Sequence, residues 1–102
     1  LFVMFGLYPN SYKEIISILQ KHNSIEKVII YGSRAKGNYR EGSDIDFTLF
    51  GTIEYDELLQ LKNEFEESYI PYLFDISIYD DLQSESLKDH INRVGKLFYI
   101  RE

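Results

Sequence analysis

Apolar residues recur at helical spacing in three segments of the chain. They predict amphipathic helices over about residues 12–22, 54–68 and 84–95, the last beginning at Ser84 or Ser86. Ser11 and Glu14 fit a capping box at the start of the first helix. Gly95 fits the left-handed residue that commonly follows a helix. The polar side of the second helix is rich in Glu and Asp, which we interpret as a solvent-exposed face.

The other apolar segments have the short patterns of β-strands. Residues 27–31 (KVIIY) form a β-branched run typical of a buried strand, and residues 97–100 (LFYI) predict a short closing strand. Apolar and polar residues alternate in residues 44–50 (DIDFTLF) and 72–79 (YLFDISIY), as in strands with two unlike faces. We therefore expect a single domain over residues 1–102 of the α/β (α+β) class. Its predicted order is α-β-turn-β-α-β-α, with a three- to four-stranded mixed sheet packed against helices.

Composition and charge narrow the classes of function. The net charge is −6, which argues against a surface that grips extended nucleic acid through its phosphates. Cysteine is absent, so disulfides and thiolate metal sites are excluded, and we expect a reducing, cytoplasmic location. Apolar runs are too short to cross a bilayer, and we expect no membrane association.

Candidate chemistry is concentrated in residues 31–46 (YGSRAKGNYREGSDID), which begin where the first predicted strand ends. On a strand, Asp44 and Asp46 would lie on one face with Cα atoms about 6.5–7 Å apart. Two such carboxylates repel each other when both are ionised, and a divalent cation between them removes that penalty. Oxygen donors without His or Cys favour Mg²⁺ or Mn²⁺.

Asp75 is the expected third carboxylate of this group. It lies between Phe74 and Ile76 in a predicted strand, where an unpaired buried charge would be costly. Three carboxylates suffice to share two ions about 3.5–4 Å apart, the arrangement used for phosphoryl chemistry. Asp80 and Asp81 are rivals for the third position, although helix capping in a turn accounts for them adequately.

The turn at Gly32 and Ser33 predicts the other half of the site. Glycine lets a phosphate approach the backbone, Ser33 adds a hydroxyl, and the N–H groups of a short helix at Arg34 and Ala35 favour an anion. The side chains of Arg34, Lys36 and Arg40 offer positive charge to a polyphosphate, although a solvated loop would explain each of them equally well. The basic turn and the acidic strand together predict a site for a metal–triphosphate.

The motif that combines these residues resembles the nucleotidyltransferase superfamily of the DNA polymerase β type. It consists of Gly32-Ser33, ten intervening residues and Asp44-Ile45-Asp46, and GSRAKG with SDID is most similar to the minimal nucleotidyltransferases. Proteins of this branch pair with HEPN-type helical proteins in toxin–antitoxin systems. Lys36 departs from the pattern because the branch often has arginine there, and lysine lacks the planar two-pronged contact.

The resemblance implies a nucleotidyltransferase fold and a role for each matched residue. Gly32 and Ser33 would contact the phosphates of ATP, while Asp44, Asp46 and Asp75 would bind two Mg²⁺ or Mn²⁺ ions and carry catalysis. The implied reaction transfers AMP to a hydroxyl, in this branch often a tyrosine of the HEPN-type partner.

The small size of the chain bears on how it would act. It leaves no room for an acceptor-binding domain, so we expect a homo- or hetero-oligomer. An alternative is a non-catalytic antitoxin or regulatory subunit that binds nucleotide and acts by direct contact with its partner.

Overall fold

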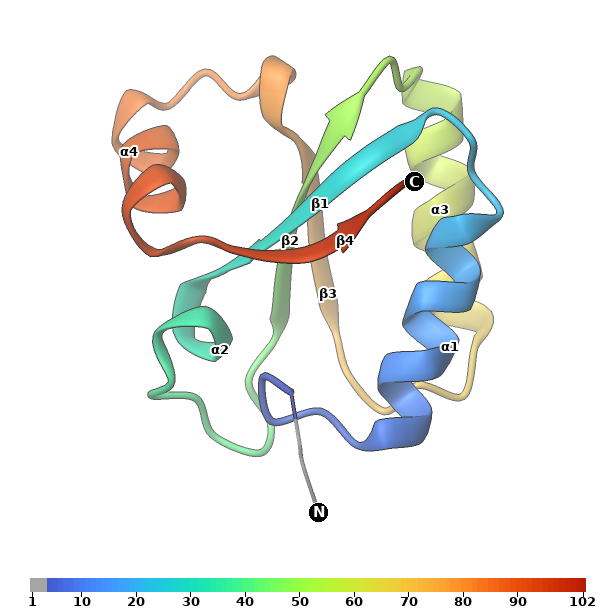
Figure 1. Ribbon diagram of the computed structural model, residues 1–102, viewed down its shortest axis with the longest axis vertical. Helices are drawn as coiled ribbons and strands as arrows, with labels where there is room; N and C mark the ends of the chain where they lie inside the picture. The colour runs from blue at the N-terminus through green and yellow to red at the C-terminus, as the bar shows by residue number, and fades with distance from the viewer. Residues whose placement is uncertain (1–3) are drawn as a thin grey trace.

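The fold is built on a mixed β-sheet between two layers of helices. The computed structural model describes residues 4–102, and across this range it contains a four-stranded sheet of order β3-β2-β1-β4. The strands are β1 (Ile25–Tyr31), β2 (Ile45–Gly51), β3 (Phe74–Ile78) and β4 (Lys96–Ile100). Strand β1 runs antiparallel to β2 and β4, whereas β2 and β3 run parallel (Figure 1). The sequence analysis is therefore correct in fold class and element order.

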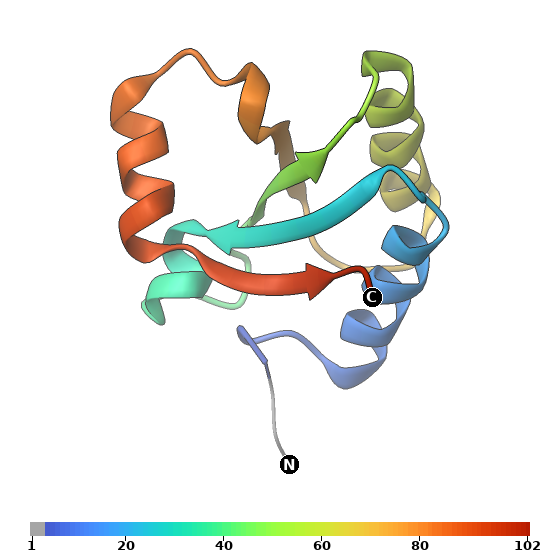
Figure 2. The same cartoon turned by 45° about the horizontal axis from the view of Figure 1, so that its top comes forward.

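Four α-helices and one 3-10 turn connect these strands within the described residues. The helices are α1 (Pro9–Gln20), α2 (Gly32–Lys36), α3 (Tyr55–Glu67) and α4 (Glu85–Val94), and the 3-10 turn η1 spans Tyr79–Asp81. Helices α1 and α3 lie on one side of the sheet, and α2 and α4 lie on the other, as Figures 1 and 2 show. No helix within residues 4–102 is long and apolar enough to cross a membrane.

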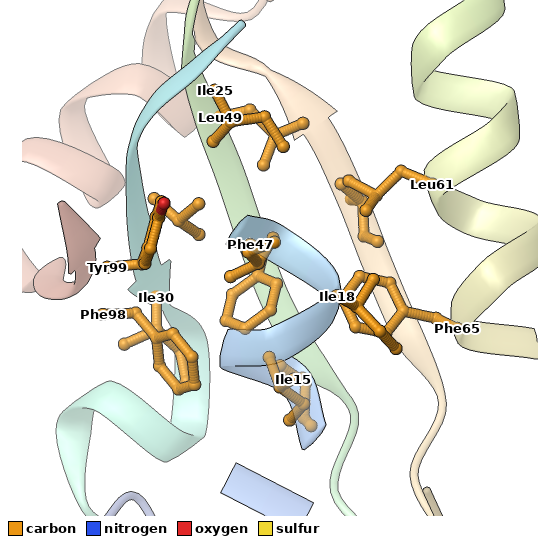
Figure 3. Packing of buried hydrophobic residues seen from close by; sticks show 14 of the residues in the cluster. Ile15, Ile18, Ile25, Ile30, Phe47, Leu49, Leu61, Phe65, Phe98 and Tyr99 are labelled. Carbon is orange, nitrogen blue, oxygen red and sulfur yellow. The ribbon is translucent and has the colours of Figure 1, made fainter. Parts of the chain in front are cut away.

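Strand β2 shows how the alternating pattern divides the sheet into two faces. Ile45, Phe47 and Leu49 are fully buried, and they pack with apolar residues of α1 and α3 in the main core (Figure 3). Because successive side chains of a strand point to opposite faces, Asp46 and Thr48 face the side of α2 and α4. One face of the sheet thus supplies the core, and the opposite face is left for polar chemistry.

Three boundary predictions differ from the structure. Helix α1 begins at Pro9, whose fixed φ suits a first turn, and not at Tyr12. The capping box is wrong because Ser11 lies inside the helix and is buried. Gly95 follows α4 with φ −64°, so the left-handed end is wrong too. The Ser84 hydroxyl caps α4 by accepting from the Leu87 N–H, as one of the two predicted starts implies.

The acidic side of α3 is less exposed than its pattern suggests. His22 is buried just beyond α1, and its two ring nitrogens lie 3.0 Å from Glu57 Oε2 and 2.5 Å from Glu64 Oε1. The Ser24 hydroxyl donates to the other oxygen of Glu57, and this hydrogen bond is the main reason why the pKa of Glu57 is lowered. These polar contacts fasten the end of α1 to α3 beside the core.

Candidate active site

Three polar residues lie side by side across the face of the sheet that carries α2 and α4. Tyr31 at the end of β1 pairs with Asp46 on β2, and Asp46 pairs with Asp75 on β3. Paired residues of adjacent strands have their side chains on the same face, and the strands lie about 4.8 Å apart. The structure therefore brings Asp46 and Asp75 together, although 28 positions of sequence separate them.

Asp44 and Asp75, the two other predicted carboxylates, are both more exposed than Asp46. Asp44 lies just before β2, whose first residue is Ile45, and its side chain is exposed. Asp75 is also exposed, because β3 borders the sheet and its polar face is open at that point. The expectation that Asp75 is buried is therefore wrong. Asp80 and Asp81 lie in η1, beyond the opposite end of β3.

Electrostatics identify Asp46 as the centre of the acidic group. Burial, followed by the charges of Asp75 and Asp44, raises the pKa of this carboxyl from 3.8 to about 6, while the charge of Arg34 lowers it. Both neighbouring aspartates thus act on Asp46 from close range. A cation placed here would relieve the repulsion among them.

The donor set fits a hard divalent cation. Carboxylate oxygens are the ligands that Mg²⁺ and Mn²⁺ prefer, and an ion would be open to water on the exposed side of the group. Within residues 4–102, no three acidic, histidine or cysteine side chains are already gathered tightly enough to hold an ion. Asp44 and Asp75 are exposed and therefore have room to move towards one. The residues therefore fit Mg²⁺ or Mn²⁺.

Gly32 places the predicted phosphate turn directly against this acidic group. It follows Tyr31 at the end of β1, has φ +72° and opens the short helix α2. A Cβ built at this position would overlap Oδ2 of Asp46. The left-handed backbone conformation therefore favours glycine, and a side chain at this position would displace the Asp46 carboxylate. The turn and strand β2 are therefore in contact, so that one metal–triphosphate could reach both of them.

The predicted phosphate contact of the Arg34 side chain differs from the structure. This side chain is 2% exposed, and its guanidinium donates to the carbonyl oxygens of Phe5, Glu41 and Ser43 at 2.8–3.2 Å. Tyr39 and Tyr72 lie against the guanidinium plane. Arg34 therefore fastens the loop before β2 to α2, and its donors are already engaged.

The remaining residues of the turn are accessible. Ser33 is half-buried in the first turn of α2, and Lys36 is exposed at its end. Arg40 is exposed in the following loop, where its backbone N–H donates to the Ser43 hydroxyl at 2.8 Å. Ser33 and Lys36 therefore remain candidates for phosphate contact.

Tyr31 is a site residue that the sequence analysis missed. It is 6% exposed, and burial raises the pKa of its hydroxyl, followed by the charge of Asp75. Its ring meets the ring of His90 on α4 edge-on at 6.0 Å. In the sequence, the position of Tyr31 directly before Gly32 could have indicated that it lies beside the site. Tyr31 thus lies beside Asp46 on the sheet and contacts α4 through His90.

Comparisons with known proteins identify the family of the chain. The family described as "Polymerase beta, Nucleotidyltransferase" matches residues 13–102. The protein named "Putative protein adenylyltransferase MJ0604" from Methanocaldococcus jannaschii is 37% identical over 51 residues. That match covers 48% of this chain and 51% of the relative, so it spans about half of each protein.

Solved structures share the fold at low sequence identity. A crystal structure of a toxin–antitoxin with AMP-PNP has a TM-score of 0.71 and 19% identity, covering 89% of this chain and 74% of that chain. A complex of tri-AMPylated Shewanella oneidensis HEPN toxin with MNT antitoxin has a TM-score of 0.66 and 17% identity, covering 90% and 71%. The fold, the glycine turn beside the paired aspartates and the match over residues 13–102 lead to one conclusion. The chain belongs to the Polymerase beta, Nucleotidyltransferase family.

Proposed function

We propose that this protein transfers AMP from ATP to a hydroxyl group of a HEPN-type partner protein, in a reaction that depends on Mg²⁺ or Mn²⁺. The observation that carries the proposal is the contact between the Gly32 turn and Asp46, with Asp75 as the strand partner of Asp46. The Gly32 turn suits phosphate and the adjacent aspartates suit divalent cations, so the two parts could bind one metal–triphosphate together.

Each residue has a definite task in this reaction. The backbone at Gly32, the hydroxyl of Ser33 and the ammonium group of Lys36 hold the β- and γ-phosphates. Asp44, Asp46 and Asp75 hold two divalent cations, which supply charge neutralisation at the reacting phosphate. The acceptor oxygen attacks the α-phosphorus, the bond to the bridging oxygen of pyrophosphate breaks, and a carboxylate of the group receives the hydroxyl proton.

The choice of ATP and of a protein acceptor draws support from the similar proteins. One relative is named as a protein adenylyltransferase, one structural neighbour holds AMP-PNP, and another pairs an MNT antitoxin with an AMPylated HEPN toxin. The net charge of −6 also favours a protein acceptor over an extended nucleic acid. The proposed partner and acceptor follow from these features together.

The test is transfer of label from α-labelled ATP to the product of the neighbouring gene, with Mg²⁺ or Mn²⁺ present. A double variant, Asp44→Asn with Asp46→Asn, should lose transfer. The matched control, Asp80→Asn with Asp81→Asn, alters two exposed aspartates of η1 and should retain it. Absence of transfer by the wild-type protein while ATP binding is intact would reject the reaction.

A binding-only antitoxin makes a different prediction for the same variants. It would still neutralise its partner after Asp44→Asn and Asp46→Asn, because direct contact requires no metal. Measuring neutralisation alongside label transfer therefore separates chemistry from contact.

A further inference from the structure

A groove beside the acidic group is left unused by the proposed roles. It has a volume of about 650 Å³ and runs between α3 and β3. Apolar residues dominate its wall, among them Phe65, Ile70 and Leu73, and Asp75 lines the same groove. The side chain of Leu73 is 75% exposed beside the groove, so an apolar group of a bound segment could pack against it. Because α3 covers the face of the sheet opposite to the acidic group, the groove meets that group only at Asp75, on the edge strand β3.

The backbone of β3 offers hydrogen bonds along this groove. Among residues 4–102, β3 pairs with β2 and has no strand on its other side. The pairing of Ile45 with Phe74, and the bond from the Ile45 N–H to the Leu73 carbonyl at 2.8 Å, fix which groups face β2. In a parallel pair this pattern turns the N–H and C=O groups of Phe74 and Ile76 towards the open edge. An extended chain could be added there as a further strand.

The geometry of phosphoryl transfer indicates what enters this groove. The attacking oxygen and the leaving oxygen lie on opposite sides of the phosphorus in an in-line displacement. The phosphate turn follows β1, and the line from Gly32 through Asp46 to Asp75 crosses the sheet from β1 to β3. If the pyrophosphate is bound at the turn, the acceptor must approach the α-phosphorus from the side of β3. This step rests on the function proposed above.

We propose that the edge of β3 and the adjoining groove bind an extended, positively charged segment of the acceptor polypeptide and present its hydroxyl side chain at Asp75. An apolar side chain of that segment packs against Leu73, and its backbone pairs with Phe74 and Ile76.

The charge of the groove favours a cationic polypeptide as its occupant. Glu66 and Asp75 both line the groove, against Lys62 as the cation of its lining. The whole chain has a net charge of −6, so a polyanion such as nucleic acid is repelled from this edge. Arginine or lysine beside the acceptor hydroxyl would be attracted to it.

The test uses two synthetic peptides that share a central tyrosine between valines, one with flanking arginines and one with flanking glutamates. AMP transfer from ATP with Mn²⁺ gives kcat and KM for each peptide. Amide hydrogen exchange followed by NMR reports directly on Phe74 and Ile76 with or without peptide. We expect transfer to the arginine peptide, little to the glutamate peptide, and slower exchange at both amides when the arginine peptide is bound.

Two pairs of variants locate the binding surface. Leu73→Ala and Glu66→Lys alter the groove, whereas Leu97→Ala, at a residue 50% exposed on β4, and Glu67→Lys alter exposed residues outside it. Leu73→Ala should raise the KM for the arginine peptide about tenfold, and Glu66→Lys about fivefold, with ATP binding unchanged. Both controls should behave like the wild-type protein.

The possible results are distinct. Equal KM values for groove variants and controls would overturn the docking surface while leaving AMP transfer in place. Weaker ATP binding by Leu73→Ala would also overturn it, because the groove would then belong to the nucleotide. Slower amide exchange with the arginine peptide but no AMP transfer would support peptide binding at this edge and overturn the presentation of the acceptor hydroxyl at Asp75. Neither transfer nor slower exchange with either peptide would reject the docking surface.

Discussion

Asp46 and Asp75 are strand partners across β2 and β3, so two carboxylates far apart in the sequence share one face of the sheet. The parallel direction of these strands matters, because it fixes both aspartates near the start of their strands, beside the turn at Gly32. The acidic group is therefore a product of sheet register. Its charge should govern how the protein responds to pH and to cations.

The contribution of Asp46 to the stability of the metal-free protein should fall as pH rises from about 4 to about 6. The folded-state pKa of Asp46 is about 6, against 3.8 for an ordinary aspartate. Between these values the folded protein holds a proton that the unfolded chain has released, so raising the pH favours unfolding. The expected loss is about 1–3 kcal/mol, which urea unfolding with a chelator present would measure. Asp46→Asn should lack this contribution, and parallel pH curves for the two proteins would contradict the assignment.

Divalent cations should raise the melting temperature through the same carboxylates. Mg²⁺ at about ten times its Kd adds about 1.4 kcal/mol to the free energy of unfolding if it binds the folded state alone. Asp75→Asn should abolish most of this gain, because one of the carboxylates beside Asp46 is lost. Asp81→Asn removes an equally exposed carboxylate from η1 and should leave the gain intact. Calorimetry over a series of Mg²⁺ concentrations distinguishes them, and an equal response of both variants would exclude Asp75 as a ligand.

Gly32→Ala should be far more damaging to ATP binding than Gly37→Ala, although both glycines have positive φ. Their φ values are +72° and +91°, so alanine in either position costs about 1 kcal/mol of backbone strain. At Gly32 the new methyl group also overlaps Oδ2 of Asp46, whereas no described residue lies within 4 Å of a Cβ at Gly37. Because Oδ2 is the end of a side chain that can turn away, we expect little further loss of stability for Gly32→Ala, but loss of ATP binding because the Asp46 carboxylate is displaced. Denaturant unfolding and equilibrium ATP binding would measure both. Similar effects of the two substitutions on ATP binding would show that close contact with Asp46 is unimportant.

Arg34→Lys should destabilise the fold, and Lys36→Ala should not. Lysine cannot reproduce the forked contacts of Arg34 with the carbonyls of Glu41 and Ser43, so about 2–3 kcal/mol should be lost. Lys36 is exposed, and its removal should cost less than about 0.5 kcal/mol. Thermal unfolding measures both effects. The proposed contact of Lys36 with phosphate predicts a raised KM for ATP in Lys36→Ala, and an unchanged KM would exclude that contact.

The sequence was sufficient for the parts of the fold that depend on local pattern. Alternation predicted the strands that carry Asp46 and Asp75, and the glycine turn predicted a short helix at Arg34 and Ala35, which the structure begins two residues earlier at Gly32. It could not reveal that β3 borders the sheet, and this position leaves Asp75 exposed where burial was expected. Strand order depends on contacts between distant segments, which a local pattern does not contain.

The roles of Arg34 and His22 escaped prediction for a related reason. Both residues look like ordinary surface residues in the sequence, yet both are buried because their partners come from elsewhere in the chain. Carbonyl oxygens bind Arg34, and the carboxylates of α3 bind His22. Every residue has a backbone carbonyl, so the partners of Arg34 cannot be recognised from the sequence. A charged residue in a motif can therefore serve architecture and not ligand binding.

The hydrogen bonds of Arg34 make the spacing between the two ends of the loop independent of the length of the loop. By gripping the carbonyls of Glu41 and Ser43, it closes residues 34–43 into a ring whose neck has a fixed width. The distance from the phosphate turn to the acidic strand is then independent of how many residues the ring contains. Gly37 and Asn38, exposed at its tip, can therefore vary without changing that distance, whereas Tyr39 packs against Arg34 and is part of the closure.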